Sequence, residues 1–371
     1  MSLRAARPAV TPNWFAVVMG TSILGTAAAT LPVSGPALDV LAWVAWALAT
    51  LAFAAAVLTT AAHYLDDRGA VRRYLDDPSM AHFFGAQAMG LLAYGAATLV
   101  VASPLLGEQW AVGIDAVLWV LGTLLGLATA IGVPVIAFTR HQVADDAASG
   151  AWLMPVVPPM VSAATGAMLL PYVDGELART LAVACYAMFG LSALAAIMVI
   201  ASLWNRLAHR QIGAAAAVPT LWIVLGPLGQ SVTAVGILAD HASSPLGISS
   251  RSLLVFSMLY GIPVMGFALM WLAIALAITV RTRRTGLPFT LAWWAFTFPV
   301  GTCVTGASQL ARHTGSAAMT GLSLGLYALL MAGWFIAATG TYRHYVRGRR
   351  LTADPETADA GAEPEPITAA A

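Results

Sequence analysis

Apolar residues are gathered into ten long stretches, and almost every charged residue lies between them. A helix of about 20 apolar residues crosses the ~30 Å hydrocarbon core of a bilayer and satisfies its own backbone hydrogen bonds there. The pattern therefore predicts an all-α polytopic membrane protein, with ten transmembrane helices in a single domain of residues 13–343. The stretches cover residues 13–33, 36–63, 80–102, 111–138, 152–172, 176–204, 214–239, 247–280, 287–311 and 317–342.

Composition agrees with this class and excludes another. Hydrophobic residues make up 59% of the chain and charged residues 9%, whereas roughly a quarter of the residues in soluble domains are charged. The net charge of +1 gives no basis for binding nucleic acid, so we expect the basic loops to contact lipid headgroups. Both cysteines fall inside apolar stretches, where we expect them to be buried without a disulfide.

The arginines predict the orientation of the chain. Lysine is absent, and 15 of the 18 arginines fall on the side that would hold both termini and every second loop. Short loops rich in arginine stay in the cytoplasm. We therefore expect a multi-pass protein of the inner (plasma) membrane with two cytoplasmic ends, a short segment 1–12 and an acidic, disordered tail 344–371. The other side holds Arg179, Arg251 and Arg312.

Helix-breaking residues recur in every second stretch. Glycine, proline, serine and threonine concentrate in the odd-numbered stretches, whereas most even-numbered ones are smoother runs of Ala, Leu, Val and Ile. Broken helices free backbone groups that lipid cannot satisfy but a water-filled cavity can. We therefore predict five helical hairpins whose odd members surround a central pore. The alternative is that small residues only let helices pack closely.

The composition of the odd stretches favours an anion as the solute. We expect no carboxylate near the centre of the bilayer, unlike the buried acid of a typical proton- or cation-coupled carrier. Helix N-termini, amides and hydroxyl groups can attract an anion without a buried cation, although a neutral solute would tolerate the same lining. Each candidate could instead form a hydrogen bond between helices, worth about 0.6 kcal/mol. The pore-lining candidates are Gly20, Thr21, Thr165, Gly166, Gly226, Gln230, Ser231, Thr297, Pro299 and Thr302.

An intramembrane enzyme is the competing class. It would need a nucleophile with its base, or metal ligands, within the membrane. The seven histidines fall at the ends of stretches or in loops, and no HExxH motif or paired cysteines occur. We therefore predict no enzyme, no catalytic residue, no metal and no cofactor.

Four motifs together resemble one family of membrane proteins. They are NWFAVVMGTSIL (13–24), WLMPVVPPMVSAATGA (152–167), GPLGQS (226–231) and WWAFTFPVG (293–301). They resemble the tellurite-resistance/dicarboxylate transporter family, also called the voltage-dependent anion channel family. This family includes bacterial tellurite-resistance proteins, plant slow anion channels, fungal malate permeases and sulfite efflux pumps. The resemblance extends from about residue 13 to residue 343.

The resemblance implies an architecture and a gate. The family has five hairpins in quasi-five-fold arrangement, a central pore in each subunit of a homotrimer, and a phenylalanine that plugs the pore. Its WW-x-x-TFP pattern places that gate at Phe298, whereas Phe296 is expected to pack between helices.

The resemblance also implies a substrate class. The expected substrates are small anions. One alternative is a C4-dicarboxylate such as malate, and the other is sulfite or another small inorganic anion. Channels and carriers share the fold, so the mode of transport stays open. The alternative is a non-transport enzyme or sensor built on the same fold.

The orientation gives a first testable prediction. A periplasmic reporter fused after Arg350 should be inactive, and the same reporter fused after Asp174 should be active, because the arginine distribution places these residues on opposite sides. The reporter activity of the two fusions in intact cells measures this. Activity of the Arg350 fusion alone would reverse the assignment.

Overall fold

The computed structural model describes residues 11–144 and 146–347, and all the regular elements in these residues are helical. The long helices are α1 (Phe15–Thr30), α2 (Pro36–Asp66), α4 (Phe84–Leu106), α5 (Glu108–Thr139), α6 (Pro158–Leu169), α7 (Gly175–Arg210), α8 (Leu225–His241), α10 (Ser250–Thr285), α11 (Phe298–Thr314) and α12 (Ala317–Thr341). Two shorter α-helices are α3 (Ala70–Asp76) and α9 (Ser243–Leu246). The 3₁₀ turns are η1 (Pro12–Trp14), η2 (Ala81–Phe83), η3 (Gly150–Leu153), η4 (Leu170–Tyr172), η5 (Ala215–Val224) and η6 (Leu291–Phe296), and a π-helical turn, η7, covers Tyr342–Arg347.

Seven segments of the described chain are long and apolar enough to cross a membrane: α2, α5, α7, α10, and the segments that contain α4, α8 and α12. The first, fifth and ninth predicted helices are shorter, since α1 has 16 residues, α6 has 12 and α11 has 17. Prolines lie in the first turn of η1, α6 and α11. A proline has no N–H group to donate to the carbonyl of a preceding helical turn, so it is favoured at the start of a helix.

A 3₁₀ turn leads into α1, α4, α6, α8 and α11, either directly or after a few residues. In contrast, α2, α5, α10 and α12 begin without one, and η4 is the last turn of α6. The helices that contain the breaker residues of the sequence thus share one local design, which is a tight turn followed by an α-helix.

These five helices are buried, and the helices that follow them are not. Helix α11 buries 14 of its 17 residues, whereas α12 buries 6 of 25. Along their most apolar windows, the segment containing α8 is 94% buried and α2 is 22% buried. We call α1, α4, α6, α8 and α11 the inner helices, and α2, α5, α7, α10 and α12 the outer helices.

The inner helices contact one another in a closed cycle. Helix α1 packs on α4, α4 on α6, α6 on α8, α8 on α11, and α11 on α1. Each inner helix also packs on the outer helix that follows it in the chain. Because consecutive packed helices joined by short connections run antiparallel, all five inner helices begin at the same end of the molecule.

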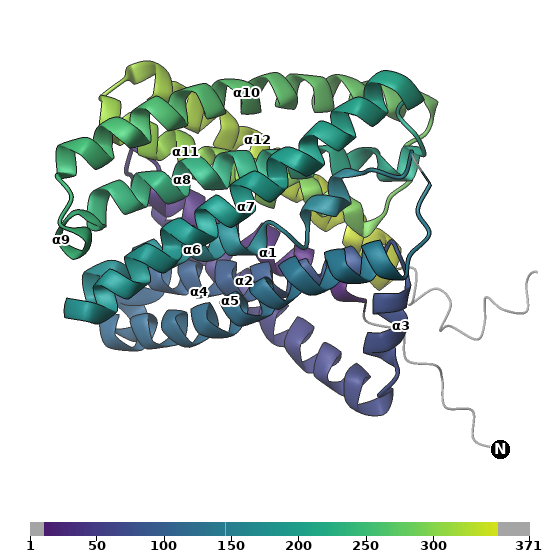
Figure 1. Ribbon diagram of the computed structural model, residues 1–371, viewed down its shortest axis with the longest axis horizontal. Helices are drawn as coiled ribbons and strands as arrows, with labels where there is room; N and C mark the ends of the chain where they lie inside the picture. Colours follow the sequence, from purple (N-terminus) through teal and green to yellow (C-terminus); the bar gives the residue numbers. More distant parts are fainter. Residues whose placement is uncertain (1–10, 145, 348–371) are drawn as a thin grey trace, which may run out of the picture.

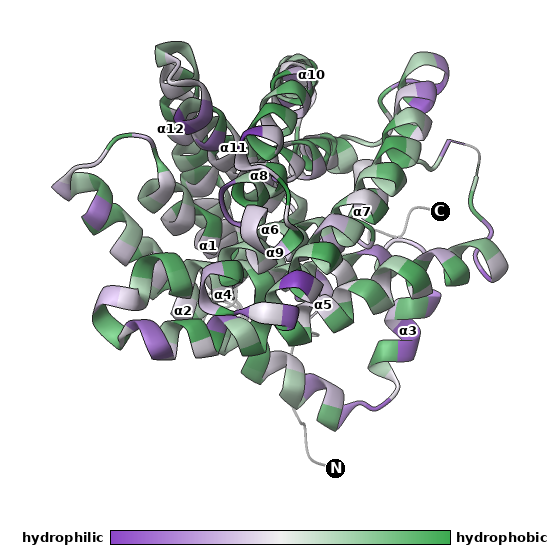
Figure 2. Cartoon of the chain, turned by 60° about the vertical axis from the view of Figure 1, so that its left-hand side comes forward, coloured by the Kyte–Doolittle hydropathy of each residue, from purple (hydrophilic) through white to green (hydrophobic). Residues whose placement is uncertain are grey.

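The two ends of the molecule differ in their connections. Helix α3 lies at one end and α9 at the other (Figure 1). The end with α3 carries the arginine-rich connections, and we call it the basic end; the end with α9 is the opposite end. Hydrophilic residues gather at the helix ends and in the connections, while most of each outer helix is hydrophobic (Figure 2).

The outer helices present large apolar side chains to their surroundings. Leu58 of α2 is 70% exposed, Phe138 of α5 is 86% exposed and Leu259 of α10 is 73% exposed. Apolar faces of this extent are unfavourable in water and favourable in hydrocarbon. The chain is therefore a multi-pass membrane protein.

Glycine brings the inner helices into close contact. A Cβ atom added at Gly229 of α8 would lie 2.5 Å from the carbonyl carbon of Thr302 and 2.7 Å from its Oγ1 on α11, and would also meet the backbone nitrogen of Cys303. Backbone atoms cannot move aside as a flexible side chain would. Gly229 therefore sets the separation of α8 and α11.

This contact predicts the effect of two matched substitutions. Gly229→Ala should destabilise the folded protein by about 1–3 kcal/mol or more, because the new methyl group overpacks a helix contact. Gly266→Ala in α10 should be neutral or stabilising, since no atom lies within 4 Å of the added Cβ and alanine favours the helix. Thermal unfolding in detergent, followed by size-exclusion chromatography, measures both. Equal unfolding temperatures for the two variants would contradict the close contact.

Candidate functional site: a passage between the inner helices

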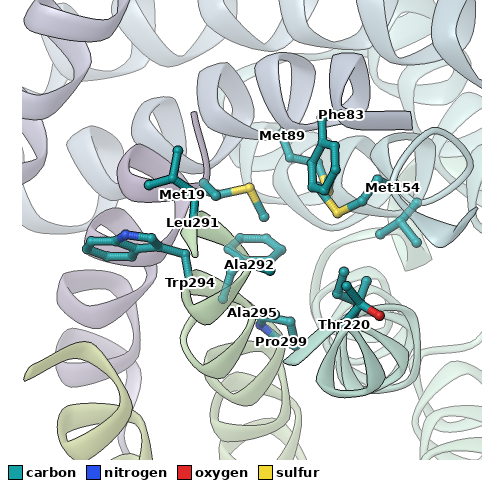
Figure 3. Close-up of a pocket in the computed structure, with 15 residues that line it drawn as sticks. Met19, Phe83, Met89, Met154, Thr220, Leu291, Ala292, Trp294, Ala295 and Pro299 are labelled. Carbon is teal, nitrogen blue, oxygen red and sulfur yellow. The ribbon is translucent and has the colours of Figure 1, made fainter. Parts of the chain in front are cut away.

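A small cavity of about 30 Å³ lies among the beginnings of the inner helices, at the basic end. Residues of four inner helices or their 3₁₀ turns, and of the short link between η3 and α6, contribute to it, so it lies on the axis that the inner helices surround. Figure 3 shows Met19, Met89 and Met154 converging on this space from three separate segments, with Trp294 and Leu291 of η6 beside them. We call it the basic-end cavity. Its other lining residues are Ala16, Phe83, Val157, Thr220, Ile223, Gly226, Ala292, Ala295, Phe298 and Pro299.

The basic-end cavity is apolar and carries no charged side chain. The hydroxyl group of Thr220 donates a hydrogen bond to the carbonyl of Ala217 at 2.7 Å, so it is already used. Three helix beginnings open on the cavity, marked by Val157 before α6, Gly226 in α8 and Phe298 in α11. Helix N-termini carry partial positive charge. The cavity therefore has a field that favours an anion over a cation.

Phe298 is placed by a break in the ninth stretch. Thr297 separates η6 from α11 with φ −106° and ψ −81°, which is not helical, and Phe298 is the first residue of α11. Its side chain is 3% exposed and lines the basic-end cavity beside Pro299. Phe296 points elsewhere, because its ring packs edge-on against two tryptophans. The distance between ring centroids is 5.0 Å to Trp222 and 5.7 Å to Trp293.

A second, larger cavity of about 490 Å³ lies among the C-terminal halves of the same five helices. We call it the opposite cavity. Thr30 of α1, Ser103 of α4, Met168 of α6, Thr233 of α8 and Thr305 of α11 all line it. Its lining is more polar than that of the basic-end cavity and also includes Glu108, Tyr172, Asp240, His241, Gln309 and Arg312.

Gln230 lies between the two cavities. Gly226 lines the basic-end cavity and Thr233 lines the opposite cavity. Gln230 follows Gly226 by four residues and precedes Thr233 by three, so the three share one face of α8. Gln230 is 5% exposed, and its Oε1 atom has no hydrogen-bond partner. An unpartnered buried amide is costly unless something polar comes to it.

Several other predicted lining residues contact neighbouring helices. Thr21 accepts a hydrogen bond from Trp334 Nε1 of α12 at 3.1 Å. Gly20 packs directly against Thr297, whose own hydroxyl group donates to the carbonyl of Trp294 at 2.6 Å. A Cβ at Gly166 would meet Trp119 Nε1 of α5 at 2.7 Å. These positions serve packing in the structure described.

Three further candidates are also bonded within or between helices. The Thr165 hydroxyl group donates to the carbonyl of Val161 at 2.9 Å. Thr302 bonds to the carbonyls of Pro299 at 2.7 Å and Gly226 at 3.2 Å, and so joins α11 to α8. Ser231 faces an apolar groove between α7 and α10 rather than either cavity. The structure therefore brings Gly226, Phe298 and Pro299 together at one cavity, with Gln230 one turn beyond.

The sequence did not single out two groups that line the cavities. Met19, Met89 and Met154 form much of the basic-end cavity, but methionine in an apolar stretch is indistinguishable from a packing residue. Arg312 and Gln309 line the opposite cavity. The only sequence signal for Arg312 is its place among the three arginines that lie off the basic end.

Nothing in the described chain forms a metal-binding cluster. No group of three or more His, Cys, Asp or Glu residues is placed to hold an ion in residues 11–144 and 146–347. Cys185 and Cys303 are free and buried. The site consists of an apolar cavity at the helix N-termini and a second cavity lined by polar and charged groups.

The sequence matches a known family. A family model described as "Voltage-dependent anion channel" matches residues 9–342, and the chain belongs to this family. It is thus a transporter or channel and not an enzyme.

Individual relatives agree with the family match. The chain is 28% identical to the "Sulfite efflux pump SSU1" of Trichophyton rubrum over 313 residues, which cover 82% of each protein. It is 26% identical to the protein of the same name from Arthroderma otae over 87% of each protein. It is 23% identical to the "Uncharacterized transporter MJ0762" of Methanocaldococcus jannaschii over 91% of this chain and 95% of that protein.

The placement of Gln230 and Thr21 predicts a difference in reactivity. Gln230→Cys should react with a small water-soluble methanethiosulfonate reagent, because position 230 lies between two cavities. Thr21→Cys should not react, because position 21 faces α12. The native cysteines are buried and give a low background. Labelling of the purified variants, followed by mass spectrometry, measures the two rates. Equal rates would contradict the passage along this face of α8.

Proposed function

We propose that the chain transports small anions across the membrane through a passage between the inner helices, with Phe298 as its gate. The observation that carries the proposal is the position of Phe298 at an uncharged cavity where three helix N-termini meet. Membership of the voltage-dependent anion channel family supports the substrate class.

The proposal includes an arrangement in the membrane. The three shorter helices α1, α6 and α11 also span it, which gives ten spans as five hairpins with the inner helices around the passage. The closed cycle of inner-helix contacts supports this arrangement. Both termini lie in the cytoplasm of a cell whose inner (plasma) membrane holds the protein, as the arginine distribution indicates. Three copies assemble, as the family resemblance implies, each with its own passage.

Selection of anions needs no buried cation. The partial positive charge at the starts of α6, α8 and α11 attracts an anion into the basic-end cavity. The absence of charged residues from the lining of that cavity avoids both trapping the anion and attracting cations. Gln230 then supplies polar atoms to the ion in the narrow part, in place of lost water.

Phe298 closes the passage without charge. An ion that passes an aromatic ring in an apolar constriction must shed water against a surface that cannot replace it. Thr297 already interrupts the helix before Phe298 and Pro299 lacks an amide, so the ring is attached at a locally weakened backbone. Rotation of the side chain away from the axis opens the passage.

Two substrate classes fit the passage. Sulfite is one, since curated relatives are named as sulfite efflux pumps. A C4-dicarboxylate such as malate is the other, from the resemblance of the motifs to the dicarboxylate branch. Both are small oxyanions, and the same helix N-termini serve either. The passage suits a channel or a carrier equally.

Removal of the ring tests the gate. Phe298→Ala should raise anion flux several-fold above that of the unmodified protein, because the constriction loses its apolar plug. Sulfite and malate flux in proteoliposomes measure the change. Purified variants are first compared by size-exclusion chromatography, so that only folded protein is assayed.

Phe296→Ala is the matched control, since it removes the same ring two residues earlier. Its ring packs against Trp222 and Trp293, so its loss should lower stability and leave flux unchanged. A folded Phe298→Ala variant that conducts no better than the unmodified protein would refute the gate. Equal stimulation by both variants would attribute the effect to loosened packing instead.

A further inference from the structure

Arg312 projects its guanidinium group into the opposite cavity from the last turn of α11. Its Nε and Nη2 atoms donate to Gln309 Oε1 at 3.1 and 2.7 Å, and its Nη1 atom donates to the carbonyl of Thr30 at 2.8 Å. A guanidinium group has five N–H donors. Two donors are therefore left for a ligand in the cavity.

The protein holds this side chain in place with neutral groups. Gln309 is 4% exposed and packs against Gly236 of α8, where an added Cβ would lie 2.8 Å from its side chain. The carbonyl of Thr30 fixes the guanidinium from α1. Three inner helices thus position one cation at the mouth of the passage, and neither acceptor neutralises its charge.

The carboxylates of the same cavity do not pair with Arg312. Among the described residues, Arg312 forms no ion pair. Asp240 Oδ1 bonds to His313 Nε2 at 2.8 Å, and His313 Nδ1 lies 3.2 Å from Ser257 Oγ. Glu108 lies beside Tyr172. Arg312 is exposed to the cavity, and Asp240 acts on its charge without contacting it directly. A guanidinium group that is held by neutral acceptors and makes no direct ion pair has the donor geometry that binds oxyanions.

We propose that Arg312 forms an anion-binding site at the mouth opposite the basic end, where it captures or releases the transported oxyanion. This inference rests on the proposed transport of small anions and adds a second site to the passage. The basic-end cavity attracts the ion through helix N-termini alone, whereas the opposite cavity holds it with a positioned guanidinium group. The ligand class is a small oxyanion, sulfite or a carboxylate, bound by the two free N–H groups.

The experiment compares four proteins in proteoliposomes: the unmodified chain, Arg312→Gln, Arg312→Lys and Arg251→Gln. Arg251 lies in the first turn of α10 and lines none of the cavities described here, so its loss is the matched control for charge. Arg312→Gln should raise the half-saturating sulfite concentration about tenfold, the effect of losing charged hydrogen bonds. Arg312→Lys should recover part of the affinity, and Arg251→Gln should match the unmodified protein.

A charge-reversal measurement separates a binding role from a structural one. Arg312→Cys is labelled in proteoliposomes with methanethiosulfonate reagents, and the native cysteines are buried. A trimethylammonioethyl reagent should raise sulfite flux toward that of the unmodified protein, and a sulfonatoethyl reagent should lower it further. Equal effects of the two reagents, or an Arg312→Gln variant with unchanged half-saturation, would overturn the site while transport itself stands. An unmodified protein without any anion flux would overturn transport and this site together.

Discussion

Hydrocarbon cannot hydrogen-bond to a peptide group, and the rest of the structure depends on this constraint. Five helices of the chain begin with 3₁₀ turns, and three of them are too short or too interrupted to cross a bilayer unaided. Such backbone is tolerated at membrane depth only where protein or water surrounds it. The five outer helices provide that surrounding, because they are long, unbroken at their starts and apolar on the faces they expose. The division into inner and outer helices is thus a consequence of where the breakers lie.

The same constraint places the chemistry. A helix that starts inside the protein leaves its positive dipole end facing inward. Three such starts converge on the basic-end cavity, which therefore favours anions although no charged side chain lines it. Helix dipoles distinguish anions from cations but bind an anion only weakly, and weak binding lets the ion leave the site again. Gln230 adds a polar group farther along, and Arg312 adds a charged one where the lining becomes more polar.

The sequence was sufficient for the class of protein and for the identity of the inner helices, because both depend on length, breakers and charge. It was insufficient for which face of each inner helix meets the passage. A helix that is apolar or small on every side has no periodic pattern to orient it, and Thr21, Gly166 and Ser231 turn toward neighbouring helices or the groove. Asp115 of α5 is another such case, since it is fully buried against Gly95 of α4 and its carboxylate has no hydrogen-bond partner. Only the packing of α4 on α5 reveals that.

The central claim is that the passage carries anions and excludes cations. The most direct measurement is the reversal potential of the purified protein in a planar bilayer, with unequal sodium sulfite concentrations on the two sides and the Phe298→Ala variant used to hold the passage open. The account predicts a potential close to the equilibrium value for the anion, since helix N-termini set the charge preference. A potential close to the equilibrium value for sodium would contradict the account.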